Sequence, residues 1–327
     1  MTAFIQSMGI ISRCAVTREA LVKLLDGADP ALSCVPIEFP SQIPPSKMRR
    51  NSRYNKLACT AADHAVREAA IPAETDRRRI GTIVSTGYGS SVYYSQFSDT
   101  VVRGVPGLCS PAIYSGMVPN ACVGQICILN GFKGPSTVLT GGDPLEYASL
   151  LLETGKADMI LCGSVEEYNP ELYTELRELE TLKDCELSEG AAMFMLTREQ
   201  TDSTICKICD FSSASLGQSP LLHMPGDEAA ADIVASVLGS CKTTPDAVFT
   251  SANGSYFDAI ENMAIQSVFP SVELVAPKKW SGETLGCGYM INTLFAAAAV
   301  QCGMYHTVLV TGTDLVGNYC TVMIGKA

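Results

Sequence analysis

The feature that most constrains the fold of this chain is the alternation of short apolar segments with longer segments of helical pattern. The apolar segments 80–85 and 159–162 have the length and composition of buried strands. Between and after them, residues 145–154 and 285–302 are predicted to be helices, and Gly155 follows the first of these where a helix end is expected. Alternating strands and helices predict α/β layers with helices on both faces of a sheet.

The alternation restarts after Leu196, and the polar stretch 201–203 is a plausible junction. We therefore expect two similar halves, residues 1–200 and residues 201–327. The other predicted helices are 58–70, 118–129 and 229–238, and the other predicted strands are 136–140, 205–211, 247–250, 307–310 and 320–324.

The charge balance excludes two classes of partner. The chain has 23 Lys and Arg residues against 34 Asp and Glu residues, a formal net charge of −11 at pH 7. Nucleic acids and anionic membranes both attract basic faces, so neither is expected as a partner. The longest apolar run, residues 294–300, falls far short of the ~20 residues that span a bilayer. We expect a soluble, cytoplasmic protein.

Neither a metal nor a nucleotide cofactor is expected. The 14 cysteines are scattered, and the one CxxC pair, at 206–209, has no second pair at zinc-ribbon spacing. The histidines His64, His223 and His306 are far apart in the sequence. The turn 86–91 lacks the third glycine of a dinucleotide-binding fingerprint, and no phosphate-binding Gly-Lys-Ser/Thr loop occurs. The cysteines are predicted to be reduced thiols of a cytosolic protein.

Several segments resemble, in chain order, landmarks of the β-ketoacyl synthase family of the thiolase superfamily. The first half has a basic stretch at 49–58, small-residue and proline-containing stretches at 110–126, and a Gly-Lys-Ala-Asp strand and loop at 155–166. The second half has Asp-Ala-Ile-Glu at 258–261 and a Lys-to-Gly segment at 278–288. This order covers nearly the whole chain. The resemblance implies an α/β, thiolase-like fold, with two similar βα halves in a layered α-β-α-β-α arrangement.

The resemblance also implies a chemistry that this chain lacks. In the family, a cysteine thiolate at a strand-to-helix turn takes the acyl group, and two histidines stabilise the enolate and the oxyanion. The nucleophile position falls at Gly142 or Asp143. The first histidine position falls at Asn253, which cannot shuttle a proton, and the second at Glu283, whose charge would repel an enolate. We therefore predict a degenerate site with no catalytic residues.

A retained scaffold with lost chemistry most resembles the chain-length factor, the inactive partner of a ketosynthase in type II polyketide or aryl-polyene-like pathways. This resemblance implies a heterodimer with an active ketosynthase, whose acyl tunnel the chain shapes during polyketide or fatty-acid-type elongation on acyl carrier protein. Ala121, Cys122 and Gly124 form the candidate dimer interface, although an ordinary core helix explains them equally well. The basic residues at 47–53 are a candidate contact for the acidic carrier protein, but a solvated face or internal ion pairs are the simpler interpretation.

Two other functions stay open at this point. One is a stand-alone acyltransferase or hydrolase with a site rebuilt around Cys122, Asp143 or Glu283, which predicts turnover or a covalent acyl adduct from the chain alone. The other is an acyl-binding homodimer without a synthase partner, which predicts no turnover. For Glu283, a structural ion pair with Lys278 or Lys279 is favoured over a catalytic role. A 1:1 partner with an intact cysteine and two histidines would favour the silent-subunit interpretation over both alternatives.

Overall fold

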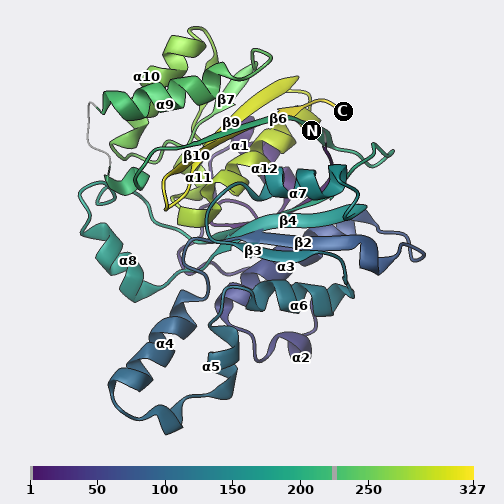
Figure 1. Ribbon diagram of the computed structural model, residues 1–327, viewed down its shortest axis with the longest axis vertical. Coiled ribbons are helices and arrows are strands. Elements are labelled where there is room, and N and C mark those ends of the chain that lie inside the picture. Colours follow the sequence, from purple (N-terminus) through teal and green to yellow (C-terminus); the bar gives the residue numbers. More distant parts are fainter. Residues whose placement is uncertain (1–2, 223–226) are drawn as a thin grey trace.

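A sheet of ten strands runs through the computed structural model, which describes residues 3–222 and 227–327 (Figure 1). Its strand order is β3-β2-β4-β5-β1-β6-β10-β9-β7-β8. The strands are β1 (Ala3–Ser12), β2 (Ile80–Ser85), β3 (Ser136–Leu139), β4 (Met159–Glu166), β5 (Gly190–Thr197), β6 (Cys206–Ser215), β7 (Ala247–Phe249), β8 (Glu273–Val275), β9 (Thr307–Thr313) and β10 (Asn318–Gly325).

The helices surround and separate the two halves of this sheet. They are α1 (Arg18–Leu25), α2 (Pro45–Met48), α3 (Arg53–Ala69), α4 (Ser91–Val102), α5 (Pro111–Gly116), α6 (Ala121–Asn130), α7 (Pro144–Glu153), α8 (Pro170–Arg177), α9 (Glu228–Gly239), α10 (Phe257–Val268), α11 (Lys278–Ser281) and α12 (Gly288–Gln301). None of the helices within the described residues is long and apolar enough to cross a membrane.

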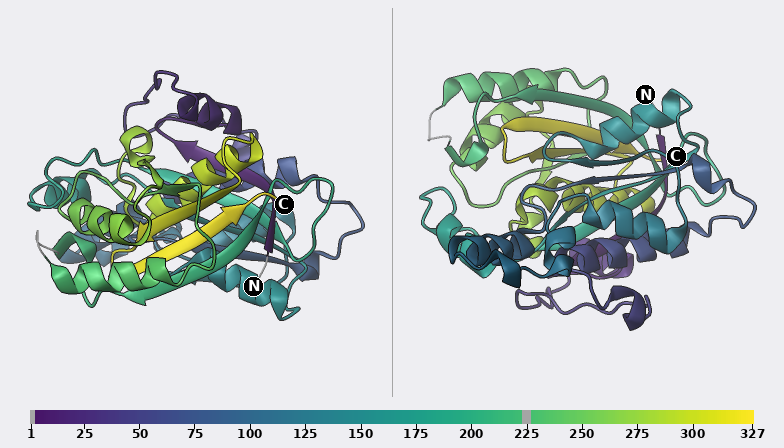
Figure 2. Two further views of the ribbon diagram at one scale, coloured as in Figure 1. Left: turned by 90° about the horizontal axis from the view of Figure 1, so that it is seen from above. Right: turned by 60° about the horizontal axis from the view of Figure 1, so that its bottom comes forward.

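The strand order repeats from one half to the other. Strands β1 to β5 lie in the order 3-2-4-5-1, and β6 to β10 lie in the corresponding order 8-7-9-10-6. The two sets join where β1 pairs with β6, Ala3 lying opposite Ile208, and the end of β10 flanks the same stretch of β6 (Figure 2). The expectation of two similar βα halves is confirmed. Their division into domains at residue 200, which lies between β5 and β6, stays a proposal.

Five layers follow from the packing of the helices on this sheet (Figure 1). The buried side chains of α3 and α6 form one core cluster with the first half of the sheet, and those of α9 and α10 form another with the second half. Helices α7 and α12 share a third cluster with strands of both halves. The expected α-β-α-β-α arrangement is therefore confirmed, with α7 and α12 as the middle layer.

Helix α12 shows why the middle layer holds together. Every residue from Gly288 to Val300 is buried, which is the pattern of a helix covered on all sides. The small side chains of the four alanines 296–299 let the strands on either side approach α12 closely and pack at interior density. The predicted helix 285–302 therefore exists, but its first turn, Leu285–Cys287, is a separate 3₁₀ turn.

Some predicted boundaries were wrong, and some elements were missed. The helix expected at 118–129 begins only at Ala121, because residues 118–120 form a turn. Strands β1 and β5, which lie at the centre of the sheet, were not predicted. Strand β1 includes Gln6, Ser7 and Ser12, which interrupt its apolar pattern, although all three side chains are buried.

A long excursion between β2 and α6 stands away from the rest of the molecule (Figure 1). We call residues 91–116, which contain α4 and α5, the α4–α5 arm. Its helices contact each other, with the rings of Phe97 and Tyr114 5.7 Å apart. None of the core clusters of the described residues includes a side chain of the arm. Large apolar side chains are exposed along it: Tyr94, Val101, Val102, Val105, Leu108 and Tyr114.

Candidate functional site

Two small cavities meet at the turn between β9 and β10, and the sequence-predicted positions lie around them. Asn253 and Glu283 line the first cavity, of about 30 Å³. Gly142 lines the second, of about 110 Å³. Asp314 and Leu315 line both cavities, so residues from the two halves of the chain meet at this turn.

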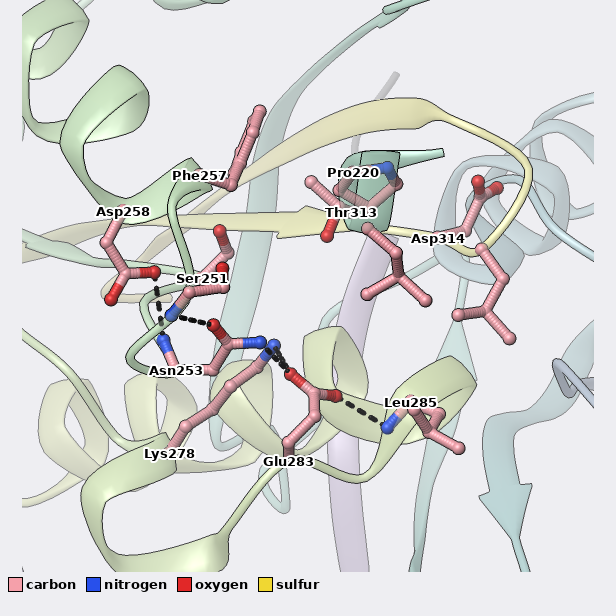
Figure 3. A pocket seen from close by; sticks show the side chains of 13 residues that line it. Pro220, Ser251, Asn253, Phe257, Asp258, Lys278, Glu283, Leu285, Thr313 and Asp314 are labelled. Atoms are coloured by element: carbon pink, nitrogen blue, oxygen red, sulfur yellow. Dashed lines mark hydrogen bonds and ion pairs between the residues drawn. The ribbon is translucent and has the colours of Figure 1, made fainter. Parts of the chain in front are cut away.

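The two positions expected for histidines contact each other directly (Figure 3). Asn253 Nδ2 donates a hydrogen bond of 2.6 Å to Glu283 Oε2. Lys278 Nζ lies 2.7 Å from the same oxygen, and the N–H of Leu285 donates to Glu283 Oε1 at 2.6 Å. Of the two lysines that the sequence offers as partners for Glu283, Lys278 is the one that pairs with it.

The loop after β7 is folded so that Asn253 reaches Glu283. Asp258, in the first turn of α10, accepts hydrogen bonds from the N–H groups of Asn253 at 3.1 Å and Gly254 at 2.8 Å. Asn253 Oδ1 accepts from the N–H of Ser255 at 2.9 Å. The amide oxygen is thus used locally, which leaves the NH₂ group facing the carboxylate of Glu283.

This arrangement makes Glu283 a structural group. Both oxygens of the carboxylate are occupied, and the side chains of Glu283 and Lys278 are each only 6% exposed. A buried charge needs a partner and hydrogen bonds of this kind to be tolerated. Neither Asn253 nor Lys278 offers the imidazole group with which a histidine takes up and returns a proton.

At the position where the resemblance predicts the nucleophile, the structure has a helix cap. Asp143 Oδ1 accepts hydrogen bonds from the N–H groups of Leu145 at 2.8 Å and Glu146 at 3.3 Å, and Pro144 takes the first helical position of α7. The hydroxyl of Tyr289 donates to Asp143 Oδ2 at 2.8 Å. Burial raises the pKa of Asp143 to about 6, and the hydrogen bond from Tyr289 opposes this rise. Gly142, just before it, has no side chain to offer.

The contact that sequence reasoning missed is made by Asp314. Its Oδ2 accepts a hydrogen bond of 2.7 Å from the N–H of Gly142, across 172 residues of sequence. The pattern Asp-Leu-Val-Gly-Asn at 314–318 is typical of a tight turn, so the turn itself could have been found. No local signal connects it with Gly142, or Tyr289 with Asp143.

The candidate interface residues divide into buried and outward-facing positions. The side chain of Cys122 is fully buried, and its Sγ lies 3.4 Å from Tyr54 Oη inside this chain. Gly124 is exposed, and a side chain added there would meet nothing within 4 Å. Ala121 is half-buried. Cys122 therefore offers no surface to a partner, while Ala121 and Gly124 keep their place in the proposed interface.

No group of three or more His, Cys, Asp or Glu side chains that could hold a metal ion occurs within residues 3–222 and 227–327. His223 lies outside this described part of the chain. The 14 cysteines, all within it, are free thiols. Burial raises the pKa of Cys122 to about 12, as it also does for Cys287.

The layered fold is thiolase-like, and the strand-to-helix turn before α7 has no cysteine. Residues 38–202 match the sequence model of the family described as "Beta-ketoacyl synthase, N-terminal domain". Since this match takes in half of the chain, the protein belongs to the β-ketoacyl synthase family.

Similar proteins of known sequence share a shorter segment. The chain is 27% identical over 124 residues to 3-oxoacyl-[acyl-carrier-protein] synthase 2 of Staphylococcus aureus, a match to 36% of this chain and 31% of that protein. The enzyme of the same name from Rhizobium meliloti (strain 1021) is 27% identical over 129 residues, covering 37% of this chain and 31% of its own length. The matched segment spans about a third of these relatives.

Solved structures match over the whole fold. The ishigamide ketosynthase/chain length factor superposes with a TM-score of 0.81 at 17% identity, covering 100% of this chain and 99% of that chain. A ketosynthase in complex with its chain length factor from Xenorhabdus doucetiae gives a TM-score of 0.80 at 16% identity, covering 99% and 98%. At these identities the likeness establishes the fold.

Proposed function

We propose that this chain is a non-catalytic ketosynthase subunit that pairs with an active β-ketoacyl synthase and shapes its acyl tunnel during chain elongation on acyl carrier protein. The observation that carries the proposal is the mutual hydrogen bonding at the two histidine positions, where Asn253 and Lys278 both bind Glu283. Together with the cap formed by Asp143, it gives the three catalytic positions structural roles.

A partner subunit is supported by the α4–α5 arm. Six of its large apolar side chains are exposed, and the arm contributes nothing to the core clusters of the described residues. Clustered exposed apolar side chains are typical of interaction surfaces. Solved structures that share this fold include ketosynthases with a chain length factor, which supports a partner of that kind.

The edge of the sheet offers a second support for pairing. Strand β3 pairs with β2 on one side and is the first strand of the sheet order. An edge strand presents unpaired backbone groups that another chain can satisfy. The side chains of Thr137, Val138 and Leu139 are half-buried, and β3 has no charged residue. The strand therefore lacks the charges that would discourage pairing with another chain.

Contact with an acidic carrier protein is supported by part of the basic cluster. Lys47, Arg49 and Arg50 are exposed around the end of α2. Arg53 instead pairs within the chain, since it binds the buried carboxylate of Glu189 and the carbonyl of Ile37. A solved structure that shares this fold is of an acyl-carrier protein in complex with its ketosynthase, which supports the same kind of contact here. A cytoplasmic location is part of the proposal.

The test is capture of the partner followed by reconstitution. The tagged chain is purified from its native host and its stoichiometric partners are identified by mass spectrometry. We expect a 1:1 partner with an intact cysteine and two histidines, which on its own elongates acyl groups to a different length distribution than it does with this chain. A homodimer without such a partner, or turnover by the purified chain alone, would contradict the proposal.

A further inference from the structure

The turn between β9 and β10 packs against the strand-to-helix turn that precedes α7. Gly141 and Gly142 have φ angles of +97° and +82°, in the left-handed region that favours glycine. A Cβ atom at Gly141 would lie 2.8 Å from Val316 Cγ2 and 2.9 Å from Asp314 Oδ2. Gly141 therefore lets the β9–β10 turn approach the backbone of the α7 turn, whereas a Cβ atom at Gly142 would meet nothing within 4 Å.

Asp314 is held firmly at the point of contact. Its Oδ1 accepts hydrogen bonds from the N–H groups of Val316 at 3.0 Å and Asn318 at 2.9 Å. Its Oδ2 accepts from Asn318 Nδ2 at 2.6 Å and from the N–H of Gly142 at 2.7 Å. Three of these four donors belong to its own turn, so the carboxylate is oriented before it reaches Gly142.

The position of this carboxylate has an electrostatic meaning. The N-terminus of α7 carries the positive end of the helix dipole, which favours a negative charge. A fixed backbone N–H at such a turn is the type of donor that stabilises the oxygen of an acyl group in acyl transfer. In this chain the N–H of Gly142 bonds to Asp314, and the first free N–H groups of α7 bond to Asp143.

The space beside this contact is small. The cavity lined by Thr140, Gly141, Gly142, Gly286 and Asp314 has a volume of about 110 Å³. Since a water molecule takes up roughly 30 Å³ in the liquid, this is room for a few waters. An acyl thioester that placed its carbonyl oxygen at Gly142 would have to displace the side chain of Asp314.

We propose that Asp314 is a built-in anion that occupies the N–H of Gly142, so that this turn excludes an acyl carbonyl independently of the missing cysteine. The inference rests on the proposed function and deepens it. The site is silent for two separable reasons, which are the loss of the catalytic side chains and the occupation of the backbone donor.

The first experiment observes the donor itself. The chain is labelled with ¹⁵N at its 27 glycines, and the amide signal of Gly142 is compared in the wild type and in Asp314→Asn, Asp314→Ala and Asn318→Ala. In Asp314→Asn the amide oxygen can keep the bonds from Val316 and Asn318, while the NH₂ group faces Gly142. We expect an upfield shift of the Gly142 proton in both Asp314 variants and none in Asn318→Ala, which keeps the carboxylate.

Acetate then serves as the probe for the vacated donor. We expect the Gly142 signal of Asp314→Ala to titrate with acetate and that of the wild type to stay unchanged at the same concentrations. A wild-type signal that titrates equally, or Asp314 variants that leave the signal in place, would overturn the proposal. The signals of Gly9 and Gly163, which are packed closely against neighbouring backbone, report whether the variants stay folded.

A second pair of variants keeps the test informative if the turn rearranges. Val316→Cys places a thiol at an exposed position of the same turn, and Val316→Cys/Asp314→Asn removes the neighbouring carboxylate. We expect iodoacetamide to alkylate Cys at this position at least 3-fold faster in the double variant, with the pH profile shifted down, because a thiolate is favoured once the anion is gone. Equal rates would overturn the proposal. Partner capture by the wild type is measured separately, so a failure of this proposal can be distinguished from a failure of the proposed function.

Discussion

Lys278 Nζ lies 2.7 Å from Glu283 Oε2, and both side chains are buried. A residue pair of opposite charge thus occupies the place where the family resemblance expects a histidine. Replacing only one residue of such a pair is destabilising, because the remaining charge is left in the interior without a partner. We therefore expect the fold to depend on Glu283, which leads to the first prediction.

Glu283→Gln is expected to destabilise the protein by about 3–5 kcal/mol, since it leaves Lys278 charged and unpaired. The double variant Lys278→Met/Glu283→Gln is expected to regain part of that loss. Urea unfolding measures both free energies. The matched control is Glu186→Gln, which removes the ion-pair partner of Arg13. The Glu186 side chain is 81% exposed, so its loss should lower the free energy of unfolding by about 1 kcal/mol or less. A loss no larger than the control's would mean that the ion pair does not support the fold.

Glu166 leads to a prediction on pH. Its carboxylate is fully buried and accepts hydrogen bonds from the N–H groups of Gly87 at 2.7 Å and Tyr88 at 3.0 Å. Burial raises its pKa to about 8, and these hydrogen bonds oppose the rise. Burial also raises the pKa of Glu167, to about 7. In the unfolded chain both groups titrate near their ordinary value of ~4.3.

A raised pKa in the folded state means that the folded protein binds these protons more tightly than the unfolded chain. The stabilisation is fully present below the ordinary pKa and is lost as the pH rises through the folded pKa values. The free energy of unfolding should therefore decrease between about pH 5 and pH 8. In Glu166→Gln the same free energy should decrease less over this range. Urea unfolding at a series of pH values checks this, with the exposed Glu180→Gln as control. If the free energy of unfolding of Glu166→Gln depended on pH in the same way as that of the wild type, the raised pKa of Glu166 would be contradicted.

The sequence predicts elements well where a segment carries its own pattern, and poorly where the pattern comes from distant contacts. Residues 80–85 were predicted as a strand with the observed bounds, because they form an unbroken buried run. Strand β1 was missed because it includes buried polar residues, among them Gln6, whose Nε2 donates to Thr197 Oγ1 across 191 residues of sequence.

The candidate site follows the same division. The positions Gly142, Asp143, Asn253 and Glu283 came from motif order, and the structure places each of them beside a cavity or at a helix end. Their partners Asp314 and Tyr289 could not be found in this way. The contacts that they make span 172 and 146 residues, and only the folded chain brings such groups together.

Cys122 leads to a third prediction, which tests the alternative of a rebuilt site. Its thiol is fully buried and its pKa is raised to about 12 by burial, so it is expected to be unreactive. Iodoacetamide should leave Cys122 unmodified in the native protein while it modifies the exposed Cys34 and Cys302. Peptide mass spectrometry measures the three sites, and unfolding in urea should make Cys122 reactive. An acyl adduct on native Cys122 would reverse this conclusion and favour a stand-alone acyltransferase.

The α4–α5 arm leads to the last prediction. Val102 and Leu108 are 85% and 78% exposed, so a charge at either position costs the isolated chain little. At an interface the same charge would be desolvated without a partner. We expect Val102→Glu and Leu108→Glu to weaken binding of the ketosynthase partner at least 10-fold, as measured by titration of the purified subunits.

The control for the arm is an exposed leucine elsewhere. Leu222 is 61% exposed and lies outside the arm, so Leu222→Glu should leave partner binding unchanged. All three variants should unfold at urea concentrations close to that of the wild type, because none of the three side chains is part of a core cluster. If Leu222→Glu weakens binding while the arm variants do not, the partner does not bind through the arm. In that case the exposed apolar side chains of the arm need another explanation.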